Sequence, residues 1–548
     1  MCLLNLLKVP MSDSLRITLS QLNYVVGDIA GNAAKMIAAA KEAAAQGSEL
    51  IVFSELSLTG YPPEDLLLRP SLQLRVETEL EKIAEASHLI AIALGFPWRD
   101  QGALFNCAAV YAGGESLGRY AKQCLPNYQV FDEKRYFSAG ETACVVELKG
   151  RKLGLTVCED IWHQGPAEQA VAAGAEMILN LNASPYHMDK QQQRIALIQQ
   201  HVKALNVPLL YVNQVGGQDE LVFDGRSFAV AADGELVAQL PAYQEQSQDL
   251  YWHKTLTTDV DLKTTETGLA SLYNALVLGV RDYVNKNGFK GIVLGLSGGI
   301  DSALTLAIAA DAIGADRVKA IMMPFTYTSG MSKEDAAEQA ERMGVPYESV
   351  SIEPMYNAFM ASLAPQFEGL SRDTTEENLQ ARCRGVLLMA VSNKTGYMVL
   401  TTGNKSEMAV GYATLYGDMV GGFSALKDVY KTKVFQLAEY RNTLGCVIPQ
   451  RVIDRPPSAE LAPDQKDEDS LPPYDVLDAI LERYIEQDMS ADSIIADGFA
   501  HEDVMRVLRL VDVNEYKRRQ APIGVRITQR GFGRDRRYPV TNGWQAGI

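Results

Sequence analysis

A polar segment in the middle of the chain, residues 242–268, separates two halves with different hydrophobic patterns. In the second half, short apolar stretches alternate strictly with helical patterns. This alternation predicts a parallel α/β sheet that binds its ligands at the carboxyl ends of the strands, and it excludes an all-helical or all-β fold there. The predicted strands are residues 292–296, 318–323, 347–352 and 397–402, and the predicted helices are 269–287, 301 onward, 332–344 and 377–394.

The first half contains more predicted strands than helices. The strands are residues 15–22, 49–55, 89–96, 106–113, 152–160, 177–182 and 208–215, the helices are 29–46 and 67–87, and 226–240 is a predicted hairpin. This pattern predicts an α+β layered sandwich. With 548 residues, 47% of them hydrophobic, the chain can bury more than one core. We therefore predict two domains, residues 13–255 and 269–548, joined by a linker at 256–268.

The chain is acidic, because 51 Lys and Arg face 68 Asp and Glu for a formal net charge of −17. Such a surface repels phosphate backbones and anionic lipid, which argues against a nucleic-acid or membrane partner. It does not exclude small-molecule substrates, including a small anionic ligand held in a local basic pocket. The seven scattered cysteines include no Cys-x-x-Cys pair, so we expect a reducing, cytoplasmic location. Lys8 and Pro10 interrupt the first apolar patch, so we predict no signal peptide, and Met11 is a second candidate start.

The string Ser-Gly-Gly-Ile-Asp-Ser follows the first predicted strand of the second half. Gly298 and Gly299 let backbone N–H groups turn toward an anion, and the following helix adds its positive N-terminal end. No Gly-Lys-Ser/Thr follows, so this is not a Walker A loop. Asp301 would repel a phosphate unless a cation lay between them, so the loop predicts Mg²⁺. The predicted phosphate-binding residues are Gly295, Leu296, Ser297, Gly298, Gly299, Ile300, Asp301 and Ser302.

In the first half, Cys158 stands at the end of a predicted strand. A cysteine there is commonly a small buried hydrophobe, but Glu55 ends another strand and Lys122 follows a third. Together they form a possible acyl-transfer group, in which Glu55 takes the thiol proton while Lys122 lowers the thiol pKa and stabilises an oxyanion. A structural ion pair between Glu55 and Lys122 is the alternative interpretation.

The loop at residues 297–302 resembles that of the N-type ATP pyrophosphatases, which cleave ATP between the α- and β-phosphates. Residues 374–385, 401–418 and 514–539 resemble NAD⁺ synthetases within that group. The resemblance implies that Thr402 contacts ATP and that Glu407 is a second carboxylate for the Mg²⁺ of Asp301. It also implies a pocket for deamido-NAD⁺ formed by Asn378, Arg382, Glu407, Tyr412, Asp418 and Lys517.

The segments around Glu55, Lys122 and Cys158 resemble the nitrilase superfamily, whose triad is Glu-Lys-Cys in this chain order. The resemblance makes Glu133 a supporting second glutamate and implies an αββα sandwich. Its glutaminase branch implies that glutamine is bound by Tyr128, Ser184 and Lys190.

Taken together, the two halves resemble the glutamine-dependent NAD⁺ synthetases from about residue 13 to residue 540. The resemblance implies that ammonia from glutamine amidates deamido-NAD⁺ through an adenylate, with a protected route for ammonia and assembly into a homo-oligomer. Two alternatives remain open. One is a ligase with another carboxylate acceptor, and the other is a nucleotide-binding sensor whose sites have decayed.

Overall fold

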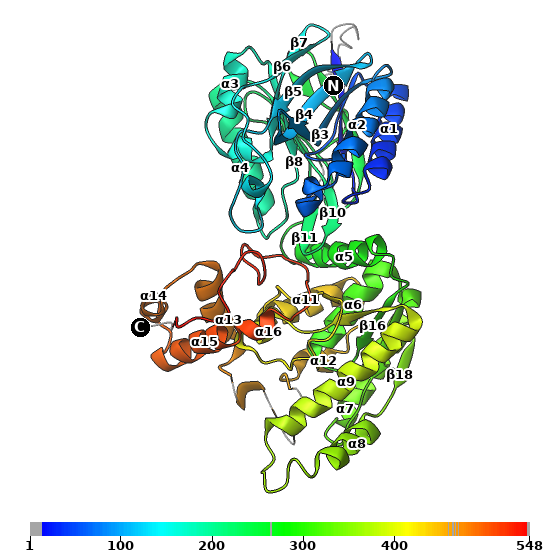
Figure 1. Ribbon diagram of the computed structural model, residues 1–548, viewed down its shortest axis with the longest axis vertical. Coiled ribbons are helices and arrows are strands. Elements are labelled where there is room, and N and C mark those ends of the chain that lie inside the picture. Colours follow the sequence, from blue (N-terminus) through cyan, green and yellow to red (C-terminus); the bar gives the residue numbers. More distant parts are fainter. Residues whose placement is uncertain are drawn as a thin grey trace, which may run out of the picture. The chain divides into compact units, whose positions relative to one another are not determined.

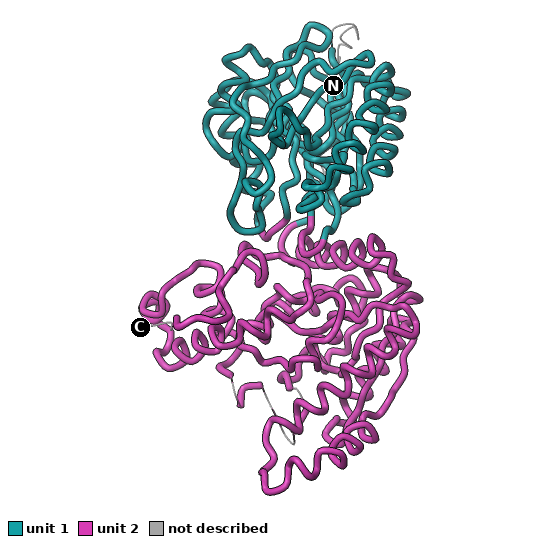
Figure 2. The backbone as a smooth tube through the Cα atoms, viewed as in Figure 1, with its two compact units in different colours: residues 1–185, 189–218, 223–266 teal, residues 186–188, 219–222, 267–548 magenta. Residues whose placement is uncertain are grey.

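The computed structural model describes residues 14–262, 266–458, 460–462, 465, 467–469 and 471–544. The candidate start Met11 lies outside these residues. The chain divides into two compact units (Figures 1 and 2). Unit 1 comprises Met1–Pro185, Asp189–Gln218 and Phe223–Glu266, and unit 2 comprises Tyr186–Met188, Asp219–Val222 and Thr267–Ile548. Unit 2 thus takes in two short segments from the first half of the sequence, which no local pattern indicated.

Unit 1 is built on two large sheets. The first has the strand order β15 (Leu256–Thr257), β14 (Gln246–Trp252), β1 (Leu15–Gln21), β2 (Leu50–Val52), β3 (Ala91–Asp100), β4 (Ala103–Ala112) and β5 (Glu115–Ala121). The second has the order β13 (Leu236–Gln239), β12 (Phe228–Val230), β9 (Leu209–Asn213), β8 (Met177–Asn182), β7 (Arg151–Val157) and β6 (Val145–Leu148). A two-stranded sheet pairs β10 (Val215–Gln218) with β11 (Leu221–Asp224).

The core of unit 1 lies between the two large sheets. One apolar cluster joins Leu19 and Val52 of the first sheet to Leu155 and Leu179 of the second. Helices α1 (Ile29–Ala45) and α2 (Pro70–Ala86) lie beside the first sheet, and α3 (Pro166–Ala172) and α4 (Lys190–Leu205) lie beside the second (Figure 1). This is the predicted αββα sandwich.

Unit 2 contains a five-stranded parallel sheet in the order β18 (Tyr347–Ser349), β17 (Val318–Met322), β16 (Ile292–Gly295), β19 (Met398–Thr401) and β20 (Phe423–Ser424). Its helices are α5 (Gly268–Lys286), α6 (Ile300–Ile313), α7 (Gly330–Met343), α8 (Glu353–Leu363), α9 (Thr374–Thr395), α10 (Lys405–Val410), α11 (Lys431–Thr443), α12 (Gln450–Asp454), α13 (Tyr474–Leu481), α14 (Ala491–Ala496), α15 (His501–Val513) and α16 (Glu515–Arg518). The parallel α/β sheet predicted from the alternation is confirmed.

The polar segment 242–268 is more ordered than its composition indicated. Strand β14 lies within it and pairs antiparallel with β1. Its side chains alternate, with Gln248, Leu250 and Trp252 buried and the residues between them partly exposed. One solvated face gives a sheet strand this mixed pattern, which resembles a linker in composition. Among the residues that the structure describes, no helix combines the length and the apolar character needed to cross a membrane.

Candidate functional site

Cys158 lies directly after β7, at the first residue of a 3₁₀ turn that ends at Trp162. Its backbone φ is +44°, a left-handed conformation that costs energy for a residue with a side chain, and its side chain is buried. Asp160 stabilises the turn, because one of its oxygens accepts hydrogen bonds from the Val157 amide (2.9 Å) and the Tyr120 hydroxyl (2.8 Å). The turn fixes the thiol at the carboxyl end of the strand.

Lys122 lies between two carboxylates. Its ammonium contacts Glu55 at 2.8 Å and Glu133 at 2.9 Å, and all three side chains are buried. Glu55 also accepts hydrogen bonds from the Asn106 side chain (2.8 Å) and the Ala183 amide (2.9 Å). The structure therefore brings residues that are far apart in the sequence into one buried group of one ammonium and two carboxyl groups.

The charges of this group act on Cys158. Burial and the charge of Glu55 raise the pKa of the thiol well above its usual value, although Lys122 acts in the opposite direction. Burial also raises the pKa of Glu133 to about 7, against the effect of Lys122. The sequence analysis expected Lys122 to lower the thiol pKa, and the structure shows that burial outweighs it. The thiol is therefore protonated at neutral pH, and attack by its sulfur requires a base.

The three predicted glutamine-binding residues occupy different positions around this group. The half-exposed Tyr128 donates a hydrogen bond at 3.0 Å to Glu159, the residue after the cysteine. Ser184 is buried and follows Ala183, whose amide contacts the Glu55 carboxylate. Lys190 is the first residue of α4, and its ammonium lies 3.9 Å from the centre of the Trp162 ring.

The predicted phosphate loop of unit 2 connects β16 to α6. Gly298 has φ = +80°, and a Cβ there would lie 2.3 Å from the Ser332 carbonyl oxygen, so only glycine fits. The Ser297 hydroxyl accepts a hydrogen bond from the Gly299 amide (3.2 Å), and the Ser302 hydroxyl donates to the Gly299 carbonyl (3.0 Å). These bonds hold the loop in a tight turn at the N-terminus of α6, which favours anion binding. The other predicted residues of the loop, Gly295, Leu296, Ile300 and Asp301, flank this turn, and Thr402 directly follows β19 at the same edge of the sheet.

Asp301 and Glu407, the predicted magnesium ligands, converge on one cation. The Lys431 ammonium lies 2.5 Å from Asp301 and 3.1 Å from Glu407. Burial and the charge of Asp301 raise the pKa of Glu407 to about 8, against the effect of Lys431. Mg²⁺ commonly takes one or two protein carboxylates together with substrate phosphates, so this donor set fits the ion. Among the described residues, no group of three His, Cys, Asp or Glu side chains forms an all-protein metal site.

The remaining predicted residues of unit 2 gather around the loop between α10 and β20. The side-chain Oδ1 of Asn378 accepts a hydrogen bond from the Thr414 hydroxyl (2.8 Å), and the Arg382 side chain donates to the backbone carbonyl of Leu415 (3.2 Å). The Lys517 ammonium donates to the Gly411 and Ala413 carbonyls, at 2.8 and 2.9 Å. These polar groups therefore hold the loop that contains Tyr412.

A pocket lies beside this loop. Of the predicted residues, Glu407 and Asp418 line it, together with Thr401, Ser424, Lys427 and Pro522. Burial raises the pKa of Asp418 and lowers that of Lys427. The pocket therefore places two carboxyl groups and one lysine at the edge of the sheet that carries the phosphate loop.

Two family models match the chain, carbon–nitrogen hydrolase over residues 16–268 and NAD synthase over residues 272–521. The glutamine-dependent NAD(+) synthetase of Acinetobacter baylyi is 54% identical over 540 residues, which cover 97% of this chain and 99% of the relative. The chain belongs to the glutamine-dependent NAD⁺ synthetase family. The Xylella fastidiosa (strain 9a5c) synthetase is 47% identical, covering 98% of this chain and 100% of the relative.

Solved structures agree with this assignment. The glutamine-dependent NAD⁺ synthetase of Acinetobacter baumannii in complex with ADP has 50% identity and a TM-score of 0.79, covering 98% of this chain and 100% of that one. A synthetase from Cytophaga hutchinsonii has 22% identity and a TM-score of 0.84, covering 97% of this chain and 98% of that one, and supports the fold alone.

Membership of the glutamine-dependent NAD⁺ synthetase family confirms the predicted activity. The chain is a carbon–nitrogen ligase that amidates deamido-NAD⁺ with nitrogen from glutamine, driven by ATP. The alternative of a different carboxylate acceptor is not supported by the NAD synthase match.

Two residues beside the predicted magnesium ligands were not among the predicted site residues. Lys431 bridges Asp301 and Glu407. The Asn404 side chain donates to Asp301 (2.8 Å) and accepts from the Glu407 amide (3.0 Å). The available signal for Asn404 was its place as an N-cap between a strand end and a helix that carries Glu407.

Proposed function

We propose that Cys158 is the nucleophile of the glutaminase reaction and that Glu55 is its base. Glu55 takes the thiol proton, the sulfur attacks the side-chain carbonyl of glutamine, and the Lys122 ammonium stabilises the oxyanion. Glu55 then returns the proton to the departing nitrogen, which leaves as ammonia. Water hydrolyses the thioester and releases glutamate. The buried ammonium between two carboxylates, next to a strained cysteine turn, is the observation that carries this proposal.

Recognition of glutamine is assigned to Tyr128, Ser184 and Lys190, with Glu133 supporting Lys122. Tyr128 is linked to the residue that follows Cys158, and Ser184 follows the amide that contacts Glu55, which supports their assignment. Lys190 rests on the family resemblance and on its proximity to Trp162, at the end of the cysteine turn.

For the synthetase reaction, we propose that the loop at residues 295–302 and Thr402 bind the phosphates of ATP. Asp301 and Glu407 would hold Mg²⁺, which supplies positive charge to the phosphates of bound ATP. Lys431 contacts both carboxyl groups, and we assign its ammonium to a phosphate oxygen of bound ATP. Residues Asn378, Arg382, Glu407, Tyr412, Asp418 and Lys517 are assigned to deamido-NAD⁺, either by direct contact or by holding the loop that forms its pocket.

At the acceptor, the nicotinate carboxylate attacks the α-phosphorus of ATP and pyrophosphate leaves. Ammonia then attacks the activated carbonyl, and AMP leaves as the amide of NAD⁺ forms. Because only unprotonated ammonia carries a free electron pair, the proposal includes a route between the sites that excludes bulk water.

We assign the glutaminase reaction to residues 13–255 and the synthetase reaction to residues 269–548, with 256–268 as the linker. The proposal also includes a cytoplasmic location, supported by the six described cysteines, all of which are free thiols. It includes a homo-oligomer, which rests on the family resemblance, and light scattering of the purified enzyme tests it.

The decisive experiment separates the two nitrogen sources. Cys158→Ala should abolish NAD⁺ formation from glutamine while formation from ammonium chloride stays near the wild-type rate. Glutamate and AMP are measured in the same reactions. Glutamine-driven synthesis by Cys158→Ala would disprove the assigned nucleophile, and loss of both reactions would argue against two separate sites.

A further inference from the structure

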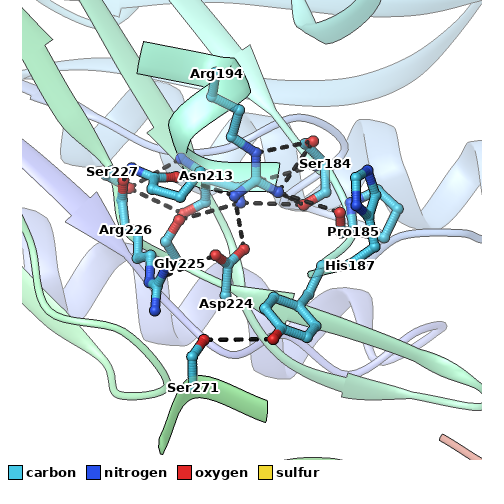
Figure 3. Close-up of polar contacts among 12 residues, drawn as sticks. Ser184, Pro185, His187, Arg194, Asn213, Asp224, Gly225, Arg226, Ser227 and Ser271 are labelled. Carbon is cyan, nitrogen blue, oxygen red and sulfur yellow. Dashed lines mark hydrogen bonds and ion pairs between the residues drawn. The ribbon is translucent and has the colours of Figure 1, made fainter. Parts of the chain in front are cut away.

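Arg194, in α4, is a buried cation whose donors all point at one cluster of acceptors (Figure 3). One terminal nitrogen donates to Asp224 (2.8 Å) and to Gln191 (3.2 Å). The other donates to the carbonyl oxygens of Ser184 (2.7 Å) and Pro185 (3.2 Å). The Ser184 hydroxyl accepts from the same nitrogen (3.1 Å) and from Nε (3.3 Å). The guanidinium thus contacts both the backbone and the side chain of one short segment.

That segment, residues 183–185, lies between Arg194 and the triad. On its other side, the Ala183 amide donates to Glu55 at 2.9 Å. The Asn213 side chain reinforces the segment, because it accepts from the Ser184 amide (2.9 Å) and donates to the Ser184 carbonyl (3.2 Å). Ser184 is therefore held from two sides, at a fixed place relative to Glu55.

The chemistry of the cluster requires arginine. The guanidinium is planar and presents five donors in a rigid fork, so it can bond Asp224 and the Ser184 segment at the same time. A lysine would keep the charge that pairs with the buried Asp224, but its single ammonium cannot reach both sides in this geometry. Arg194 is buried, and its hydrogen bonds go to Asp224, Gln191 and the Ser184–Pro185 segment, so it acts on the site through that segment.

We propose that Arg194 is a positioning residue of the glutaminase site, which sets the location of the Ser184 hydroxyl for glutamine recognition. This inference rests on the proposed role of Ser184. It extends that role to a residue in α4 that acts through the backbone and side chain of Ser184.

The test compares Arg194→Lys with Asp224→Asn in the full-length enzyme. Arg194→Lys should raise the KM for glutamine about tenfold and lower kcat by a smaller factor, because a displaced Ser184 hydroxyl loses one hydrogen bond to glutamine, which is worth up to about a factor of ten in affinity. Asp224→Asn keeps an acceptor oxygen for Arg194 and removes only the buried charge. It should lower thermal stability and change the KM for glutamine by less than about twofold. Ammonia-driven synthesis should remain at the wild-type rate in both variants, because both residues belong to unit 1 and that reaction is assigned to unit 2. A cooperative thermal transition of unit 1 shows that the variants are folded.

A double-mutant cycle with Ser184→Ala separates positioning from a general structural effect. If Arg194 acts through Ser184, Arg194→Lys should change the KM far less in the Ser184→Ala background. Fully additive effects, or an unchanged KM in Arg194→Lys, would overturn the inference. If Arg194→Lys does not fold, Gln191→Met removes a single acceptor of the guanidinium and should raise the KM in the same direction, and an unchanged KM there would also overturn it. Glutamine-driven synthesis by Cys158→Ala would instead disprove the underlying glutaminase assignment.

Discussion

Replacing Lys122 by methionine tests the electrostatics of the glutaminase site most directly. The substitution keeps the length of the side chain but leaves Glu55 and Glu133 facing each other without a cation. Glu55 is 0% exposed and Glu133 is 4% exposed, so water cannot take over the role of the ammonium. We therefore expect a large loss of stability in unit 1 together with loss of glutaminase activity.

The magnitude follows from the cost of neutralising a buried carboxylate. Glu133 already has a pKa of about 7 and can be protonated at little further cost, so the penalty falls mainly on Glu55. Protonating an ordinary glutamate at pH 7 costs about 3–4 kcal/mol, within the range of roughly 3–5 kcal/mol for breaking a buried ion pair. For a domain of this size, such a loss lowers Tm by roughly 6–20 °C.

The loss should depend on pH with a definite sign. Burial already raises the pKa of Glu133 to about 7, and removing the Lys122 ammonium removes the charge that opposes this shift, so the folded variant binds protons more tightly than the unfolded chain. Stability is then retained near pH 5 and lost as the pH rises to about 7 and above. At pH 5 the cost of protonating a glutamate falls to about 1 kcal/mol, so the variant should approach the wild type there.

Tryptophan fluorescence provides the assay. Three of the four tryptophans, Trp98, Trp162 and Trp252, belong to unit 1, and the fourth, Trp544, is already exposed. The matched control is Lys149→Met, which breaks the exposed pair with Glu49 and should cost no more than about 1 kcal/mol. Adding Glu55→Gln and Glu133→Gln to Lys122→Met should restore most of the stability without activity. A Lys122→Met variant as stable as the wild type at pH 8 would refute this account of the site.

Two further predictions concern unit 2. Lys431→Met should leave Asp301 and Glu407 free to bind Mn²⁺ or Mg²⁺ without ATP, and isothermal titration calorimetry measures this binding. The control Lys433→Met changes a partly exposed lysine and should bind metal like the wild type. Equal metal binding by both variants would contradict the assigned cation position. Gly298→Ala should abolish AMP formation and leave glutamine hydrolysis intact, because its Cβ would lie 2.3 Å from a carbonyl oxygen. The control Gly330→Ala should retain both reactions, because a Cβ there meets nothing within 4 Å.

The strand ends that carry the chemistry could be predicted from the sequence, but most partners of those residues could not. Apolar stretches located β7 and β16, and therefore the positions of Cys158 and Asp301 at the edges of their sheets. Lys431 lies 130 residues after Asp301, and hydrophobic periodicity carries no information about such a pairing. For the same reason, the convergence of Glu55 and Lys122 was inferred from the family resemblance and not from hydrophobic periodicity. Burial, which raises the pKa of Cys158 despite Lys122, became apparent only in the folded structure.

In the described structure, three buried lysines each lie between two carboxylates. Comparing their hydrogen bonds distinguishes lysines that can bind a substrate from a lysine that only stabilises the fold. Lys405 contacts Asp428 and Glu486, but it also donates to the Thr528 hydroxyl and the Arg530 carbonyl, so its three N–H groups are fully used within the protein. Its role is to anchor the C-terminal segment.

Lys122 and Lys431 differ from Lys405 in their hydrogen bonds. Within the described part of the chain, the hydrogen bonds of each ammonium go only to its two carboxylates, which leaves one N–H for a further oxygen. Lys122 lies beside Cys158, the proposed nucleophile, and Lys431 lies beside Asp301 of the predicted phosphate loop. A perturbed pKa alone would select all three lysines, because structural ion pairs shift pKa values as well. The unused donor is the feature that selects the two lysines suited to bind a substrate oxygen.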